Sequence, residues 1–139
     1  MISLQRSDLP APLGRFVDFL WYWEGDPASY AKEAISASCT CGILISLRAD
    51  ELCYYDGDGY RRRNPLKGIA INGPNSSHFA IDAFQPHMMG VAFKPGGAFP
   101  FVGPAVHDFH NAHISLGDIW GAGAEPLHQR LGQAPTPTD

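Results

Sequence analysis

Histidines at a regular spacing are the first feature of this 139-residue chain that could do chemistry. His107, His110 and His113 lie three apart, and His128 follows in the same C-terminal stretch. On a helix, positions three apart adjoin but positions six apart lie on opposite sides, and on a strand a spacing of three alternates faces. Metal ligands must converge, and the His-Glu-x-x-His pattern of zinc proteases is absent. We therefore expect surface or capping histidines, with neither a bound metal nor another cofactor.

The three cysteines are a second set of candidate ligands. Cys39 and Cys41 would share one face of a strand, and Cys53 could lie on the partner strand. A structural zinc site needs a fourth ligand at a recognisable spacing, and none stands out. We interpret the cysteines as small buried hydrophobic residues. An odd count without a disulfide framework fits a reducing, cytoplasmic location.

Signatures of nucleophilic catalysis and of nucleotide binding are absent. Ser76-Ser77-His78 places hydroxyls beside an imidazole, but sequence neighbours on a strand point to opposite faces. No nucleophile elbow, phosphate loop or dinucleotide fingerprint occurs. The pair Gly96-Gly97 has neither a following Lys-Ser/Thr nor a helix directly behind it. We therefore predict no catalytic residues and no enzymatic activity.

Aromatic side chains are abundant, with eight Phe, five Tyr and three Trp. Ligand pockets are mostly apolar, with a few polar groups that fix the orientation of the ligand, so aromatic strand residues could line one. The competing interpretation is that the same side chains form a packed core. The candidate ligand-binding residues are Trp21, Trp23, His78 and Phe93.

The charge of the chain argues against nucleic acid as a direct partner. The net charge is −4, whereas phosphate contacts usually require a basic excess or a basic face. The one basic run, Arg61-Arg62-Arg63, follows a hairpin turn, where such charges usually face solvent or protect an edge strand. No window approaches the ~20 apolar residues of a membrane span, and the N-terminus lacks the layout of a secretory signal.

Turn signals recur along the first hundred residues. With 15 Gly and 12 Pro, the chain favours many short elements, as in an antiparallel β-sandwich or barrel. Residues 1–15 read as an irregular approach segment, and residues 28–37 are ambiguous. The predicted strands cover residues 16–24, 40–47, 52–55, 60–64, 68–72, 78–84 and 88–94.

The pattern becomes helical after Phe101. Ser115 and Asp118 have the spacing of a capping box, and we expect short helices near 116–121 and 124–131. The fold class is thus α+β and mostly β: one domain over residues 1–135, with strands over about 16–101 and helices over about 104–132. Residues 133–139 read as a linker-like tail. The candidate interface residues are Leu116, Ile119, Trp120, Leu127 and Leu131.

The stretch Gly90–Phe101 should join the two parts. Val91 and Phe93 alternate as in a strand, and Pro95-Gly96-Gly97 then breaks the ladder. We expect Phe99 and Phe101 to seat the helical part on the strands.

Several segments coincide with one known pattern. The chain resembles the N-terminal sensor-like domain of AraC/XylS-type bacterial transcription regulators over roughly residues 9–135. The segments that carry the resemblance are Trp21–Gly25, Gly42–Leu47, Gly73-Pro74, Gly90–Ala98 and Leu116–Gly121. The Phe-Lys-Pro-Gly-Gly-Ala and Asp-Ile-Trp-Gly pieces are the most specific.

The resemblance implies a cupin-like β-barrel followed by helices, which binds a small effector or mediates formation of a homodimer. It also implies a separate C-terminal pair of helix-turn-helix motifs, which needs on the order of 100 further residues, so we expect no direct DNA contact by these 139 residues. Three alternatives remain open. A cupin-type metalloenzyme would need a His-x-His pair, which the chain lacks. The others are a stand-alone small-molecule-binding protein and a dimerisation module with a filled barrel.

Overall fold

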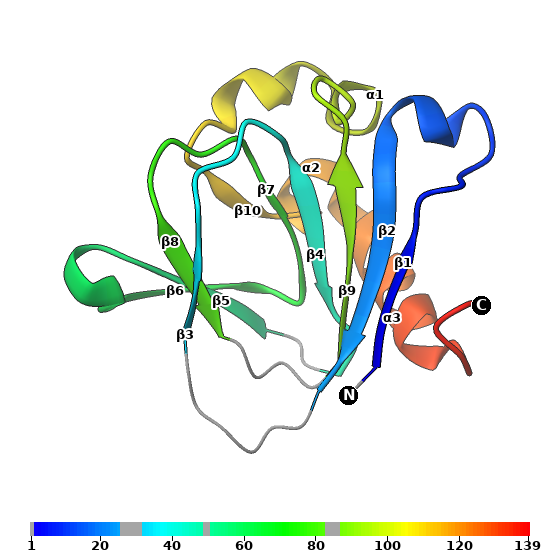
Figure 1. Cartoon of the computed structure of the whole chain (residues 1–139), viewed down its shortest axis with the longest axis horizontal. Coiled ribbons are helices and arrows are strands. Elements are labelled where there is room, and N and C mark those ends of the chain that lie inside the picture. Colours follow the sequence, from blue (N-terminus) through cyan, green and yellow to red (C-terminus); the bar gives the residue numbers. More distant parts are fainter. Residues whose placement is uncertain (1, 26–31, 49–50, 83–86) are drawn as a thin grey trace.

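Two antiparallel β-sheets and a set of short C-terminal helices make up the computed structural model (Figure 1). The structure describes residues 2–25, 32–48, 51–82 and 87–139. The large sheet has the strand order β1-β2-β9-β4-β7-β10, and the small sheet has the order β3-β8-β5-β6. The predicted mostly-β class with C-terminal helices is confirmed.

The strand bounds follow the predicted ones over most of the chain, since the seven predicted strands correspond to β2 and β4 to β9. The strands of the large sheet are β1 Ile2–Arg6, β2 Val17–Glu24, β9 His87–Phe93, β4 Gly42–Ser46, β7 Ile69–Asn72 and β10 His113–Ser115. Those of the small sheet are β3 Lys32–Ile35, β8 Phe79–Asp82, β5 Glu51–Asp56 and β6 Arg62–Lys67.

Three strands are absent from the sequence-based prediction, and each has a physical reason. Residues 1–15 were expected to be irregular, but β1 pairs with β2 along its whole length. Every side chain of β1 is exposed, so its sequence does not need to alternate between apolar and polar residues. The strand β3 lies in the ambiguous region 28–37, of which residues 28–31 are outside the described part. The strand β10 has three residues, which is too short for a periodic signal.

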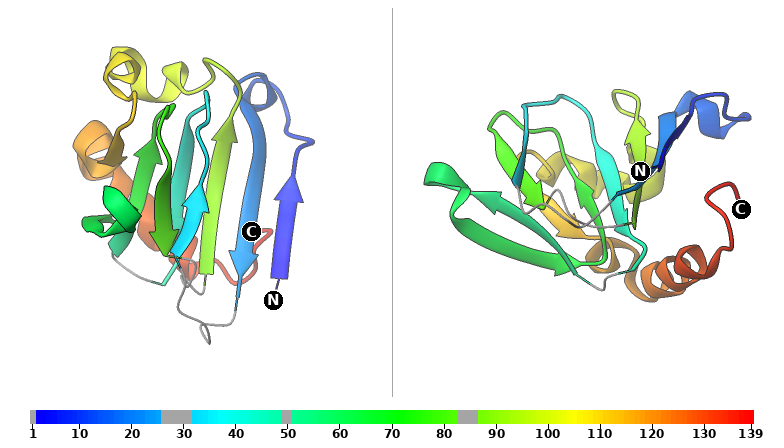
Figure 2. Two further views of the ribbon diagram at one scale, coloured as in Figure 1. Left: turned by 60° about the vertical axis from the view of Figure 1, so that its left-hand side comes forward. Right: turned by 60° about the horizontal axis from the view of Figure 1, so that its bottom comes forward.

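Alternation along the large sheet divides its side chains between two cores. Paired residues on neighbouring antiparallel strands point to the same face. One row points toward the small sheet: Trp21, Gly90, Leu44 and Ala70. The next row points to the outer face: Leu20, Val91, Ile43 and Ile71. Figure 2 shows the helix α3 lying along this outer side of the large sheet.

The helices cover the outer face and complete the main core. They are α1 Phe99–Val102, α2 Gly117–Trp120 and α3 Ala124–Gln133, and short 3-10 turns span Leu13–Arg15, Asp58–Tyr60, Gly103–Asp108 and Gly121–Gly123. Leu116 is completely buried in this core, which corrects its assignment as an interface residue because no partner could reach it. The other four candidates, Ile119, Trp120, Leu127 and Leu131, pack partly buried against the same core.

The joint between strands and helices forms where it was expected. Gly97 lies so close to the carbonyl of Phe16 that a Cβ there would overlap it, and Gly96 has φ +74°. Phe101 packs on Phe93, with ring centroids 5.3 Å apart. Phe99 is 50% exposed, so the expectation that it helps to seat the helices is wrong. It precedes Pro100 in the first turn of α1, on the side that faces solvent.

Two polar contacts attach the C-terminal part to the strands. Ser115 does not cap α2; its Oγ accepts a hydrogen bond from the backbone N–H of Lys67 (2.9 Å) and so ties β10 to the end of β6. The buried His128 of α3 lies with Nε2 2.5 Å from the carbonyl oxygen of Ser46. Within the described ranges, no helix is long and apolar enough to cross a membrane.

The close approach of Trp21 to Gly90 yields a test of the inner core. A Cβ on residue 90 would overlap the Trp21 indole, so Gly90→Ala should lower the free energy of unfolding by about 2 kcal/mol. In α2, a Cβ on Gly117 would meet only open space, and the φ of this residue is ordinary, so Gly117→Ala should be neutral or slightly stabilising. Urea denaturation measures the free energy of unfolding of both variants. Equal values for the two would contradict the close packing of Trp21 on Gly90.

Candidate functional site

The inner faces of the two sheets enclose a small and mainly apolar cavity. The large sheet contributes Leu44, Ala70 and Met88, and the small sheet contributes Leu52, Leu66 and Ile81. The open volume is about 20 Å³, which accommodates about one water molecule. The space between the sheets is therefore almost filled by side chains.

Three polar side chains also line this cavity: Tyr54 of β5, Asn72 of β7 and His113 of β10. None of the three makes a side-chain hydrogen bond with another residue in the described part of the chain. In the same part, every side-chain nitrogen or oxygen that is sealed from solvent has a hydrogen-bond partner. The polar atoms of these three residues therefore keep access to open space.

Local geometry explains how the three side chains come together. Asn72 and His113 are directly paired across β7 and β10, so their side chains share the inner face. Gly42, on the other side of Asn72, leaves room for its amide, since a Cβ there would lie 3.3 Å from Asn72 Oδ1. The Tyr54 ring stacks on the His113 imidazole from the opposite sheet, with centroids 4.0 Å apart and planes at 27°.

Burial keeps the polar groups of the cavity uncharged at neutral pH. The imidazole of His113 is enclosed by Tyr54 and by Phe79, whose ring centroid lies 4.4 Å away. Burial lowers the pKa of His113 from 6.5 to about 4, against a smaller opposing effect of Asp56. Burial also raises the pKa of Tyr54, with a further contribution from Asp56. The third group, the amide of Asn72, carries no charge.

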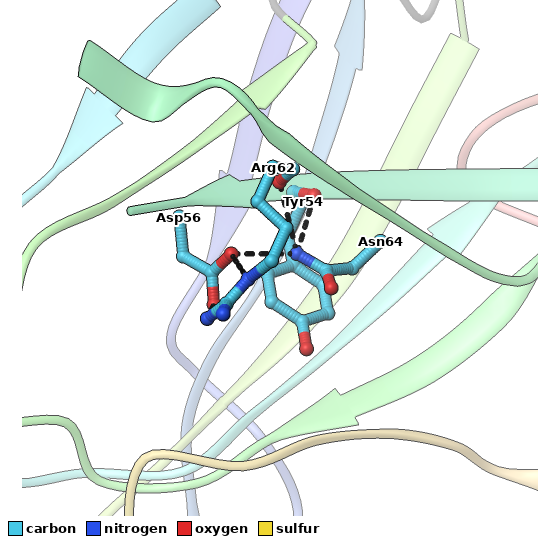
Figure 3. Close-up of polar contacts among 4 residues, drawn as sticks. All are labelled: Tyr54, Asp56, Arg62 and Asn64. Carbon is cyan, nitrogen blue, oxygen red and sulfur yellow. Dashed lines mark hydrogen bonds and ion pairs between the residues drawn. The ribbon is translucent and has the colours of Figure 1, made fainter. Parts of the chain in front are cut away.

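An ion pair stands at the edge of the site. Figure 3 shows Asp56 and Arg62 beside the ring of Tyr54, with Asn64 reaching toward the same carboxylate. Arg62 donates from Nε to Oδ1 and from its terminal nitrogen to Oδ2 of Asp56, both at 2.6 Å, and Asn64 Nδ2 donates to Oδ1 at 2.9 Å. The hydrogen bond from Arg62, helped by that from Asn64, lowers the pKa of Asp56 to about 2.

A cleft of about 270 Å³ lies outside the cavity and shares Tyr54 and His113 with it. Asp56 and Arg62 line this cleft, and so does His78. Tyr54 and His113 thus separate a polar mouth from an apolar interior. Apolar surface combined with a few convergent polar groups is typical of small-molecule sites.

The structure distributes the four predicted ligand-binding residues over different places. His78 lies exposed at the mouth, and Trp21 packs against the residues that line the cavity. Trp23 is paired with Met88, and its ring covers Gly25. Phe93 is three residues from Gly90 and points to the opposite face, into the core under the helices, which corrects its assignment to the pocket.

Sequence reasoning did not identify Tyr54, Asn72 or the role of His113. Only the pairing of β7 with β10 brings Asn72 and His113 together, and only the stacking of the two sheets adds Tyr54. The one available signal was a His followed by an alternating pair, Ile114-Ser115, which is too short to indicate a strand.

The other histidines and the cysteines take separate places. His107 and His110 are exposed, Cys41 and Cys53 are buried as expected, and Cys39 is exposed, contrary to expectation. Among the described residues, no group of three or more His, Cys, Asp or Glu side chains is arranged to hold a metal ion. The three arginines at 61–63 are exposed at and along the edge strand β6, as predicted.

A second cleft, of about 330 Å³, lies on the outer face of the large sheet beside the end of α3. Three of its polar side chains, those of Tyr22, Glu24 and His87, already bond to one another. The hydroxyl of Tyr22 lies 3.0 Å from Glu24 Oε2 and 3.1 Å from His87 Nδ1, and His87 Nε2 lies 3.3 Å from Glu24 Oε1. Because these groups have partners, we take the inter-sheet site as the candidate.

The low pKa of His113 predicts a specific dependence of stability on pH. The unfolded chain takes up a proton at this residue near pH 6.5 and the folded chain only near pH 4, so stability should fall as the pH drops through this interval. The loss attributable to His113 should be on the order of 2 kcal/mol. The test is urea denaturation of the wild-type protein and two variants at pH 7.5 and 4.5. His113→Phe should remove this loss of stability at low pH, while the same substitution at the exposed His110 should not. An equal pH dependence in all three proteins would contradict the burial of a neutral imidazole.

Comparison with known proteins identifies the family of the chain. A search among curated proteins found no match, and neither did a search among solved structures. One family model, described as a domain of unknown function (DUF6597), matches residues 9–115. This match covers β2 to β10, with every residue assigned to the cavity and its mouth. The chain therefore belongs to the DUF6597 family.

Proposed function

We propose that this chain is a non-catalytic regulatory domain that binds a small effector between its two sheets, as part of an AraC/XylS-type transcription regulator. Support comes from the segments that resemble the sensor-like domains of those regulators, including Gly90–Ala98 and Leu116–Gly121. In this proposal the two sheets correspond to a cupin-like barrel, and a separate helix-turn-helix domain binds DNA in the cytoplasm.

One observation carries the binding proposal: the side chains of Tyr54, Asn72 and His113 face one apolar cavity without hydrogen-bond partners among the described residues. Unpaired polar groups next to apolar surface are costly unless water or a ligand satisfies them. A ligand with a hydrogen-bonding group could do so while burying its apolar part against Leu52, Leu66 and their neighbours.

The chain offers two short connections from the site to the helices. His113 lines the site, and Leu116, three residues later, is completely buried in the core under α2 and α3. The strand β9 has Met88 in the cavity and Phe93 against Phe101 in the outer core. Displacement of β9 or β10 by a ligand would thus reach the helices, through which we propose that the domain forms a homodimer.

A dimerisation module with a filled barrel is the second candidate, and the cavity volume of about 20 Å³ favours it. Under this alternative no effector enters, and the polar side chains hold water. Entry of a ligand, by contrast, requires movement of flexible side chains, for which the unbranched Met88 is well suited. The two functions therefore differ in whether a small molecule stabilises the fold.

Thermal-shift screening with a broad set of metabolites separates the two functions. A ligand that binds only the folded state must raise the melting temperature. Tyr54→Phe removes a hydroxyl from the site and should weaken the shift, with an about fivefold higher Kd for the loss of one hydrogen bond. Tyr22→Phe makes the same chemical change in the outer cleft and should leave the thermal shift and the Kd unchanged. If no compound stabilises the protein, the filled module is the better description.

Bound metal provides a check on the remaining alternative, a cupin-type metalloenzyme. We expect elemental analysis of the purified protein to find less than stoichiometric iron, zinc or manganese. One equivalent of any of these metals, retained after dialysis, would overturn the non-catalytic proposal.

A further inference from the structure

We infer that the molecule bound between the sheets is uncharged, with an apolar ring-sized body and one hydrogen-bonding group such as a hydroxyl or a carbonyl. This inference rests on the proposed binding function and adds the chemical class of its ligand. It is drawn from the side chains that line the cavity and from the ion pair at its mouth.

The cavity itself contains no charge that could balance a charged ligand. Its polar lining consists of a phenol, an amide and an imidazole, from Tyr54, Asn72 and His113. The imidazole is enclosed between two aromatic rings and is neutral at physiological pH, because burial lowers its pKa to about 4. An unpaired ion transferred from water into such surroundings loses its hydration without gaining a counter-charge.

The charges of Asp56 and Arg62 at the mouth already form an ion pair with each other. Both carboxylate oxygens of Asp56 accept hydrogen bonds from Arg62, and Asn64 donates a third. The two opposite charges form a bidentate pair, which leaves little field for an ion at the mouth. A ligand that recruited either charge would have to break this pair.

Two further polar residues of the mouth, Asn75 and Asn111, have partners within the fold. Asn75 Nδ2 donates to the carbonyl oxygens of Ser36 and Ser77, and Asn111 exchanges hydrogen bonds with Ser76. His78 is exposed at the rim, outside the cavity. Inside the cavity, the groups that can orient a ligand are the three uncharged ones, which can both donate and accept hydrogen bonds.

The size of the two spaces sets the size of the ligand. The mouth cleft holds about 270 Å³, below the usual 300–1,000 Å³ of drug-sized sites, and the inner cavity adds about 20 Å³. The stacked rings of Tyr54 and His113 form a flat wall between the two spaces. A single ring with one polar substituent matches this space and this wall.

A matched series of ring compounds tests the ligand class directly. Benzyl alcohol, benzoate and benzylamine share a ring and differ in charge, being neutral, anionic and cationic at pH 7.5. Titration should be followed by NMR of carbon-13-labelled methionine methyl groups. Met88 lines the cavity, whereas the adjacent Met89 points to the other face and serves as an internal control. We expect benzyl alcohol to shift the Met88 signal with an affinity at least about tenfold higher than either ion.

Two variants should shift the preference among the three ring compounds in opposite directions, one toward the anion and the other toward the cation. Asp56→Asn leaves the guanidinium of Arg62 without its partner, so benzoate should gain about tenfold relative to benzyl alcohol. Arg62→Gln leaves the carboxylate of Asp56 unpaired and should favour benzylamine by a similar factor. Asp118→Asn, at an exposed position on α2, should change neither ratio.

The outcomes separate this inference from the function on which it rests. Binding of an ion as tight as that of benzyl alcohol, or tighter, would overturn the ligand class while leaving a binding site in place. If no ring compound in the series, and no member of the metabolite set, perturbs Met88, the binding function itself is wrong.

Discussion

Burial of the large sheet on both faces is the constraint on which the rest of the structure depends. The strands β9, β4 and β7 lie in its middle, between the small sheet on one side and the helices on the other. Successive side chains must therefore satisfy two different cores, and a register error of one residue would exchange them. The isoleucines at 43, 45, 69 and 71 all point to the outer face, where the helices cover them.

The inner face follows a different rule, because two sheets must approach each other there. Small residues at 70 and 90 alternate with large ones, and the Trp21 ring occupies the space that a side chain on Gly90 would take. This close packing leaves little open volume in the apolar interior. The three polar side chains that line the cavity include Tyr54 and His113, whose stacking joins the two sheets.

The contrast between the two clefts explains why polar residues alone do not indicate a site. In the outer cleft, Tyr22, Glu24 and His87 satisfy one another, which stabilises the end of β2 against β9. At the inner site the groups are neutral and have no such partners in the described part of the chain, although they stand beside apolar surface. The first arrangement holds the fold together, whereas the second retains hydrogen-bonding capacity for another molecule.

Much of the fold could be predicted because alternation and turn residues are local. The strand of Val17–Glu24, the helix of Ala124–Gln133 and the break at Pro95–Gly97 all follow from patterns within a dozen residues. The candidate site could not, since Asn72 and His113 are 41 positions apart in the sequence and meet only through the pairing of β7 with β10. Phe93 shows the same limit. The local sequence identifies it as an apolar strand residue, but only the fold shows that it points to the outer face, which the helices cover. By itself the sequence determined seven strand assignments and the helix of Ala124–Gln133, but not β1, β3 or β10, because strand and helix preferences act between near neighbours and need a periodic pattern. The tertiary structure alone decided which polar groups share a cavity, because that depends on contacts between segments that the chain keeps far apart.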